Sequence, residues 1–313
     1  MSASKLFQPF QLGDITLQNR VVMAPLTRFR ANDEHVHGDL AAEYYAQRAS
    51  VPGTLLITRR RSSPSARADT PNVPGIWTDA QIAGWRKKEE IKEYVQLYAT
   101  AAANGVHKAG FDGVEIHNAN GYFLDQFLQD VSNNRTDEYG DSIENRARFS
   151  LEVIEAVTKA VGQKRVGIRF SPWGTFQDMR MNGDYMNDPK PTFSYLVTKL
   201  RDTYPEFAYI HVTEPRVAGA SDREPEEGES NDFLREIWGS RPYLSAGGYT
   251  RNLAIKTADE KNELIVFGRY FISNPDLPLR LKEDIPFTPY NRDTFYTPKN
   301  PIGYTDYPFA LRS

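Results

Sequence analysis

The residues best suited to chemistry lie in the segment 114–122, which reads VEIHNANGY. A short apolar run ends at His117, and Asn120 and Tyr122 follow within one turn. An imidazole N–H and a carboxamide N–H can together hold one carbonyl oxygen, which draws electron density from the β-carbon of an enone. A phenol such as that of Tyr122 can deliver a proton to the α-carbon. The structural alternative is that His117 satisfies a backbone carbonyl and Asn120 caps the next helix.

Two strand ends late in the chain carry glycines that can bind a phosphate. They are Gly247 and Gly248, after the run YLSA, and Gly268, which Arg269 follows. Glycine lets backbone N–H groups approach an anion, and the loops after the last two strands of a barrel often bind phosphate. Glycine at a strand end is also ordinary turn chemistry. Two such ends in succession favour a phosphate-bearing cofactor.

Arg169 stands in an otherwise apolar run, VGIRF, at residues 166–170. A buried arginine is costly unless an anion meets it, and the anion is either a core carboxylate or a bound cofactor or substrate. The first predicted strand ends in Pro25, Leu26 and Thr27, which offer a hydroxyl and a backbone amide at the same carboxyl edge. For the charged segment 134–149 we expect a structural role, in which it ties a loop to the next helix.

The elements that must position these residues are short apolar runs alternating with helical stretches. Most runs are apolar on both faces, which is typical of parallel strands buried between helices and a core. No G-x-G-x-x-G follows any run, which disfavours an open dinucleotide-binding sheet. We expect a single domain over residues 1–313, with a parallel sheet that is open or closed into a barrel. The predicted strands are Val21–Leu26, Thr54–Thr58, Gly113–His117, Val166–Phe170, Ala208–Val212, Tyr243–Ala246 and Leu264–Phe267, and the predicted helices include Asp39–Ala49, Ile143–Val161 and Thr192–Asp202.

The strand count is one short of a closed barrel, since seven strands are recognisable and a (β/α)8 barrel needs eight. A helical pattern begins at Thr78-Asp79 and continues to Lys108, far beyond the mean helix length of about 11–12 residues. Two helices joined where a strand has been lost, near residues 86–89, explain this length better. Three explanations are open for the two strands beside the gap, Thr54–Thr58 and Gly113–His117, which would be strands two and four of a complete barrel. Either they pair directly in a strained barrel, or the gap between them stays open, or the sequence omits part of the coding sequence.

Composition excludes several classes of function. The 41 acidic and 38 basic residues nearly cancel, so no global field favours nucleic acid or an anionic membrane. The absence of cysteine excludes disulfides, iron–sulfur clusters and thiol nucleophiles. His35 and His37 lack a third ligand at a recognisable spacing, so no metal site is expected, and the arginines of segment 59–69 read as a solvated loop. The start is too polar for a signal peptide and no apolar run spans a membrane, so we expect a soluble, cytoplasmic protein.

With these residues in view, the chain resembles the Old Yellow Enzyme family, especially its fungal members, over nearly its whole length. The resemblance implies a TIM-type (β/α)8 barrel, here with one βα unit truncated, that holds FMN non-covalently. It also implies an enzyme that takes electrons from NAD(P)H, bound transiently at the substrate's own site. Such an enzyme reduces the C=C bond of α,β-unsaturated carbonyl compounds. The likeness is carried by APLTR at 24–28, PGTLLIT at 52–58, and the segments 117–122, 135–149, 246–249 and 267–275.

The resemblance also assigns roles to single residues. His117 and Asn120 resemble the pair that binds the substrate carbonyl, and Tyr122 the proton donor. Thr27 resembles the threonine at the O4 and N5 side of the flavin ring, and Arg169 the arginine against N1 and O2, where it stabilises reduced flavin. The remaining assignments are Pro25 beside the flavin, the phosphate cradle Gly247, Gly248, Gly268 and Arg269, and Tyr296 as the aromatic residue that caps the substrate pocket.

The chain departs from the family in ways that leave a second interpretation open. The third strand, with a glutamine that clamps the N3 edge of flavin, has no counterpart. Arg59 begins a run where the family has Glu-Ala-Thr, Asn118 replaces a glycine, and Asp141 replaces the second of two glycines. The alternatives are a catalytically impaired or inactive relative that has lost part of the flavin site, and a flavin-free barrel that performs acid–base chemistry. For the active form we expect a small enone or enal substrate, and a monomer or homodimer.

Overall fold

The computed structural model describes residues 4–32, 36–59, 88–180, 188–219 and 221–311. The chain forms two compact units. Unit 1 comprises residues 1–11, 16–60 and 244–313, and unit 2 comprises residues 12–15 and 61–243. His35, the segment 60–69 and the predicted helix start at Thr78 lie outside the described residues. The single domain expected over residues 1–313 stays a prediction.

Unit 1 contains parallel strands in the order β4-β3-β11-β10. Val22 of β3 is in register with Leu55 on one side and Val266 on the other, so β3 is an interior strand. All three residues of β3 are buried, which explains its apolar sequence. The bounds are β3 (Val21–Met23), β4 (Leu55–Leu56), β10 (Tyr243–Ala246) and β11 (Leu264–Phe267).

The helices of unit 1 bury a core around β3 and β11 that includes Leu6, Tyr44 and Phe271. The Thr250 hydroxyl caps one of them, α8, by accepting a hydrogen bond from the backbone N–H of Leu253. These helices are α1 (Asp39–Arg48), α8 (Arg251–Lys261), α9 (Arg269–Ser273) and α10 (Leu277–Glu283), with 3-10 turns at Lys5–Phe7 and Arg292–Thr294.

Unit 2 contains parallel strands in the order β7-β6-β5. Arg169 on β6 is in register with His117 on β5 and with His211 on β7. Gly167 gives the ring of Tyr209 room beside β6, because a Cβ there would lie 2.2 Å from that ring. The bounds are β5 (Val114–His117), β6 (Val166–Phe170) and β7 (Tyr209–Thr213).

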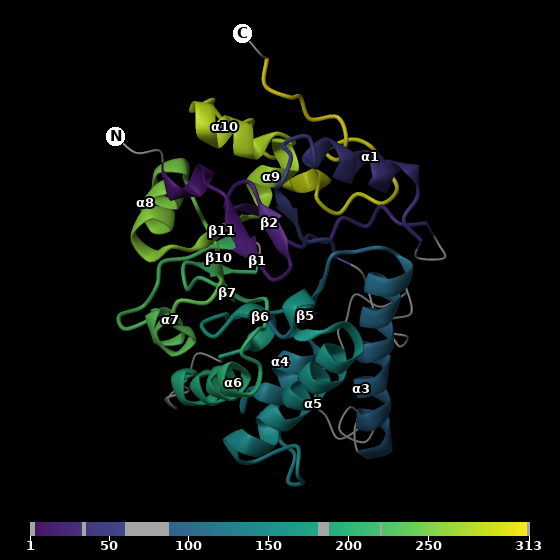
Figure 1. Ribbon diagram of the computed structural model, residues 1–313, viewed down its shortest axis with the longest axis vertical. Coiled ribbons are helices and arrows are strands. Elements are labelled where there is room, and N and C mark those ends of the chain that lie inside the picture. The colour runs from purple at the N-terminus through teal and green to yellow at the C-terminus, as the bar shows by residue number, and fades with distance from the viewer. Residues whose placement is uncertain (1–3, 33–35, 60–87, 181–187, 220, 312–313) are drawn as a thin grey trace. The chain divides into compact units, whose positions relative to one another are not determined.

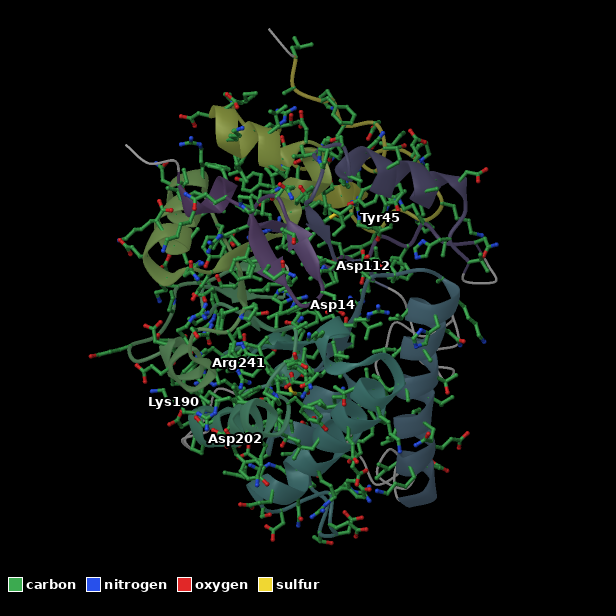
Figure 2. All side chains as sticks on the ribbon, viewed as in Figure 1. Asp14, Tyr45, Asp112, Lys190, Asp202 and Arg241 are labelled. Atoms are coloured by element: carbon green, nitrogen blue, oxygen red, sulfur yellow. The ribbon has the colours of Figure 1, made fainter. Side chains whose placement is uncertain are left out.

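The helices of unit 2 pack around α5, which lies beside α3, α4 and α6 in Figure 1. Arg241, labelled in Figure 2, donates to the carbonyl oxygens of Arg201 and Tyr204 and so ties the end of α6 to the segment before β10. The helices are α3 (Lys88–Ala103), which continues as a π-helical turn (Asn104–Lys108), α4 (Phe123–Leu128), α5 (Ile143–Val161), α6 (Lys190–Thr203) and α7 (Asp232–Trp238), with 3-10 turns at Gln163–Arg165 and Phe176–Asp178.

Four short strands form two small sheets that the sequence analysis did not predict. In one of them a tight turn at Gly13 follows the first strand, with φ +55°, and a Cβ there would lie 2.0 Å from the carbonyl oxygen of Lys164. A side chain therefore cannot replace the glycine. The strands are β1 (Phe10–Leu12) with β2 (Ile15–Leu17), and β8 (Val217–Ala218) antiparallel to β9 (Ser221–Asp222).

Each of the seven predicted runs carries a strand, so the prediction from apolar periodicity is confirmed. The helix predicted at Ile143–Val161 has the same bounds in the structure. Within the described residues, β4 and β5 are the two ends of the strand order, and each has one hydrogen-bonded neighbour. In a closed eight-stranded barrel the missing third strand would lie between these two. The described helices contain none that is long and apolar enough to cross a membrane.

Candidate functional site

In unit 2, the turn after β5 brings three predicted site residues together. The rings of His117 and Tyr122 lie 5.0 Å apart, tilted by 44°. Asn120 has a left-handed backbone with φ +58°, which turns the chain sharply between them. Within the described residues, the Asn120 carboxamide makes no hydrogen bond. The turn therefore places an imidazole and a phenol close together, and Asn120, on the same turn, is half-exposed.

Arg169 extends from β6 beside His117, and its Nη2 lies 3.5 Å from Thr213 Oγ1. The core carboxylate considered for it is Glu115, but the Glu115 Oε2 atom lies 2.8 Å from His211 Nδ1 and also accepts a hydrogen bond from Tyr209. Arg169 acts on this carboxylate through its charge. Both the carboxylate and an anionic ligand thus remain compatible with its position.

The pair Glu115 and His211 is a buried titratable group that the sequence analysis missed. Burial opposes ionisation of Glu115, but His211, Arg169 and Tyr209 together hold its pKa below the ordinary value. Burial also lowers the pKa of His211, so near neutral pH we assign a carboxylate that accepts the Nδ1–H of a neutral imidazole. A carboxylate inside an apolar strand was the signal that could have revealed this pair.

In unit 1, the remaining residues that were predicted to bind the cofactor lie at neighbouring strand ends. The backbone N–H of Ala24 donates to the carbonyl of Phe267 at 2.9 Å, which sets the segment with Pro25 and Thr27 beside Gly268. A Cβ on Gly268 would meet Leu26 only at 3.4 Å, an ordinary contact, so packing does not require glycine there.

A second strand end with glycines follows β10. Gly247 and Gly248 have φ +136° and +59°, which are conformations that favour glycine. Beyond β11, the Arg269 guanidinium lies 3.3 Å from the hydroxyl of Tyr290. Arg59 donates a hydrogen bond to the hydroxyl of Thr27, a contact that was not predicted from the sequence. A charged run directly after a strand was the only hint of it.

Tyr296 lies on the segment after the 3-10 turn Arg292–Thr294 and is 51% exposed. Its ring is 5.7 Å from that of Phe29, which is equally exposed. Two buried arginines fasten this segment to the chain after β3. Arg28 donates to the carbonyl of Gly303 at 2.6 Å, and Arg30 donates to that of Thr294 at 2.8 Å.

The charged segment 134–149 has the structural role expected of it. Arg135 and Asp137 form an ion pair. Arg146 donates to the carbonyl oxygens of Leu128 and Asp141 and so joins the start of α5 to the end of α4. Nearby, the buried Asn118 donates to Ser150 of α5 at 3.0 Å. Within the described residues, no group of three or more His, Asp or Glu side chains is placed to hold a metal ion.

The sequence matches the NADH:flavin oxidoreductase / NADH oxidase family over residues 5–88 and 87–287. The two matched stretches meet at the place where the third strand is missing. An NADP-dependent oxidoreductase of Aspergillus flavus, lnbE, is 43% identical over 98% of this chain and 97% of its own length. That alignment has 372 positions, at least 59 more than the 313 residues of this chain, so it contains gaps here.

Two further fungal relatives differ in the activity that their names state. The chanoclavine-I aldehyde reductase fgaOx3 of Penicillium roqueforti is 42% identical over 98% of this chain and 97% of its own length. The probable inactive dehydrogenase easA of Claviceps purpurea is 40% identical over 99% of this chain and 96% of its own length.

Two solved structures are similar to the whole chain. Old Yellow Enzyme from Pichia sp. AKU4542 has a TM-score of 0.84 and 32% identity, and covers 99% of this chain and 95% of its own. Morphinone reductase in complex with tetrahydroNAD has a TM-score of 0.81 and 33% identity, and covers 99% of this chain and 98% of its own. The fold is therefore that of a TIM-type barrel, and the main sheet of the described residues contains seven strands.

Proposed function

Because the chain belongs to the NADH:flavin oxidoreductase / NADH oxidase family and, within it, to the Old Yellow Enzyme family, we propose that it reduces the C=C bond of α,β-unsaturated aldehydes or ketones. It is an NAD(P)H-dependent flavin oxidoreductase with FMN as cofactor. The observation that carries the proposal is the turn that groups His117, Asn120 and Tyr122 beside Arg169.

The residues of this turn match the needs of enone reduction. His117 and the Asn120 carboxamide, which has no partner within the described residues, donate hydrogen bonds to the substrate carbonyl. They thereby stabilise the negative charge that develops on its oxygen. Tyr122 delivers a proton to the α-carbon as its C=C π bond breaks. When bound, FMN would supply the hydride that the β-carbon receives, and NAD(P)H would reduce the flavin again.

The residues present also fit FMN. Gly247 and Gly248 hold left-handed backbone conformations at a strand end, where their N–H groups can donate to a phosphate. A Cβ on Gly268 would make only ordinary contacts within the protein, so close approach of a ligand explains the glycine better than packing does. Arg269 adds positive charge to this cradle. We assign Pro25, Thr27 and Arg169 as residues that contact the flavin ring. Tyr296 is assigned as the aromatic residue that caps the substrate pocket.

The second candidate is a catalytically impaired member of the family. Its support is the missing third strand and the relative in Claviceps purpurea that is named probable inactive. Loss of that strand removes hydrogen-bonded neighbours of β4 and β5, and each buried unpaired backbone group costs about 1–3 kcal/mol. The intact turn from His117 to Tyr122 favours the active form. The relative in Penicillium roqueforti that is named an aldehyde reductase supports an aldehyde as well as a ketone as the carbonyl group of the substrate.

The visible spectrum of the purified protein tests the proposal. We expect the absorbance of bound oxidised flavin, anaerobic bleaching by NADPH, and recovery of the colour when 2-cyclohexenone is added. The product should be cyclohexanone, which gas chromatography identifies. Flavin that is bleached and then not recoloured by any enone or enal would support the impaired form. A protein that stays colourless after incubation with FMN would contradict both the proposal and the assigned cofactor residues.

A further inference from the structure

The turn that carries Asn120 has an unusual backbone. Asn120 and Gly121 are consecutive left-handed residues, with φ +58° and +68°. A non-glycine residue in this region costs on the order of 1 kcal/mol, so the conformation needs support from outside the turn. Gly121 cannot carry a side chain, because a Cβ there would lie 2.8 Å from the Cβ of Gln177.

The peptide groups of Asn120 are held by two side chains that follow β6. The backbone N–H of Asn120 donates to Ser171 Oγ at 2.7 Å. Gln177 Nε2 donates to the carbonyl oxygen of Asn120, also at 2.7 Å. Gln177 itself also has a left-handed backbone, with φ +60°. The residue that donates to Asn120 is therefore in the same unfavourable backbone region as Asn120.

The peptide groups of Gly121 are held by two side chains of α4. The backbone N–H of Gly121 donates to Asp125 Oδ2 at 2.8 Å, and Gln126 Nε2 donates to the Gly121 carbonyl at 2.6 Å. Both side chains are buried. Gln129, one helical turn later, donates to the other oxygen of Asp125 at 2.9 Å and fixes that carboxyl group in turn.

Both backbone polar groups of both residues are therefore bound by side chains, while the Asn120 carboxamide has no partner within the described residues. We propose that four positioning residues hold this turn so that the carboxamide of Asn120 is preorganised for a substrate carbonyl: Ser171, Gln177, Asp125 and Gln126. A fixed donor stabilises developing charge without reorganising during the reaction. This inference rests on the proposed function, because it matters only if Asn120 binds substrate.

Gln177 offers the clearest test, because its side chain is half-exposed whereas the other three are buried. Removing a buried partner leaves a buried polar group unpaired and risks general destabilisation. Gln177→Met keeps the length of the side chain and removes the donor. Gln47→Met is the matched control, because Gln47 also donates from its amide to a backbone carbonyl, that of Thr305 at 2.9 Å.

The experiment is a double-mutant cycle on the FMN-loaded enzyme, with kcat/KM for 2-cyclohexenone as the readout. We expect Gln177→Met to lower kcat/KM about tenfold when Asn120 is present, and by less than about twofold in the Asn120→Ala background. Gln47→Met should leave kcat/KM unchanged in both backgrounds, and flavin content should be equal in all variants. If turnover of Asn120→Ala is too slow, the same cycle is measured on the dissociation constant of a phenol ligand by absorbance.

Each other result has a defined meaning. An equal loss in both backgrounds would show that Gln177 acts on the fold in general, and no loss with Asn120 present would show that its hydrogen bond positions nothing. Either result overturns the inference and leaves the proposed function standing. If Asn120→Ala itself has full activity and full ligand affinity, the role proposed for Asn120 fails, and the inference fails with it.

Discussion

His117 and Arg169 are register partners on the adjacent parallel strands β5 and β6. Partners in a parallel sheet project to the same face, and neighbouring strands are about 4.8 Å apart. A residue proposed to bind the substrate carbonyl and a residue proposed to bind flavin therefore start from one level of the sheet. Strand register alone places His117 and Arg169 side by side. Because they are separate side chains with different proposed ligands, we expect substrate binding and flavin binding to be separable by mutation.

Replacing His117 and Asn120 together by alanine should separate ligand binding from flavin binding. We expect affinity for a phenol or an enone to fall at least tenfold, because both donors to the bound oxygen are lost. Flavin content should not change, since Arg169 and the glycines of the proposed phosphate site are intact. Spectral titration measures the first and the visible absorbance ratio of the purified protein the second. Loss of flavin from this variant would mean that the pair has been assigned to the wrong ligand.

Gly268→Ala tests the phosphate cradle without straining the protein, because the added Cβ would meet only ordinary contacts. We expect the dissociation constant for FMN to rise about tenfold, which corresponds to about 1.4 kcal/mol. Riboflavin, which has no phosphate, should bind equally well to both proteins. Gly38→Ala is the control, since a Cβ there meets nothing within 4 Å. Fluorescence titration of the apoprotein gives the constants, and equal losses for FMN and riboflavin would place Gly268 away from the phosphate.

Asp125 should make stability depend on pH. Burial raises its pKa from 3.8 to about 7, so the folded protein keeps a proton that the unfolded chain releases. This contribution is fully present below pH 3.8 and is lost as pH rises through 7. Asp125→Asn removes it, and we expect the variant to gain about 2–3 kcal/mol relative to wild type between pH 5 and pH 8.

Urea unfolding at both pH values measures this gain for Asp125→Asn. The control is Asp130→Asn, the same substitution at an exposed aspartate two residues past α4, and a gain of the same size there would mean that burial of Asp125 is not the cause. A wild type that becomes more stable relative to Asp125→Asn as pH rises would have the opposite sign and would refute the assignment.

Asp141→Gly should stabilise the protein. Asp141 is exposed and has φ +68°, and its interaction with Arg146 uses the backbone carbonyl, which glycine retains. Relief of the left-handed strain outweighs the added flexibility of glycine, and we expect a gain of about 0.5–1 kcal/mol. Asp112, which is labelled in Figure 2, is an exposed aspartate without a positive φ, so Asp112→Gly is the matched control. Thermal unfolding of both variants measures the difference; a gain of the same size at Asp112 would exclude backbone strain as the cause.

Much of the fold and part of the site could be predicted because they depend on local sequence. The run VGIRF is apolar except for Arg169 whatever surrounds it, so β6 could be placed to the residue. His117, Asn120 and Tyr122 lie within one turn of the chain, so their proximity follows from their spacing. The missing strand was also detectable, since a count of apolar runs and the length of one helical pattern do not depend on tertiary contacts.

What only the tertiary structure decided are contacts between residues far apart in sequence. Gln177 meets Asn120 across 57 positions, and Glu115 meets His211 across 96. Such contacts depend on strand register, and a shift of one residue would turn each side chain to the other face of the sheet. The sequence by itself determined which chemical groups the chain possesses and which short segments carry them. Register and side-chain packing decided which of those groups hold the Asn120 turn, and no local pattern encodes that choice.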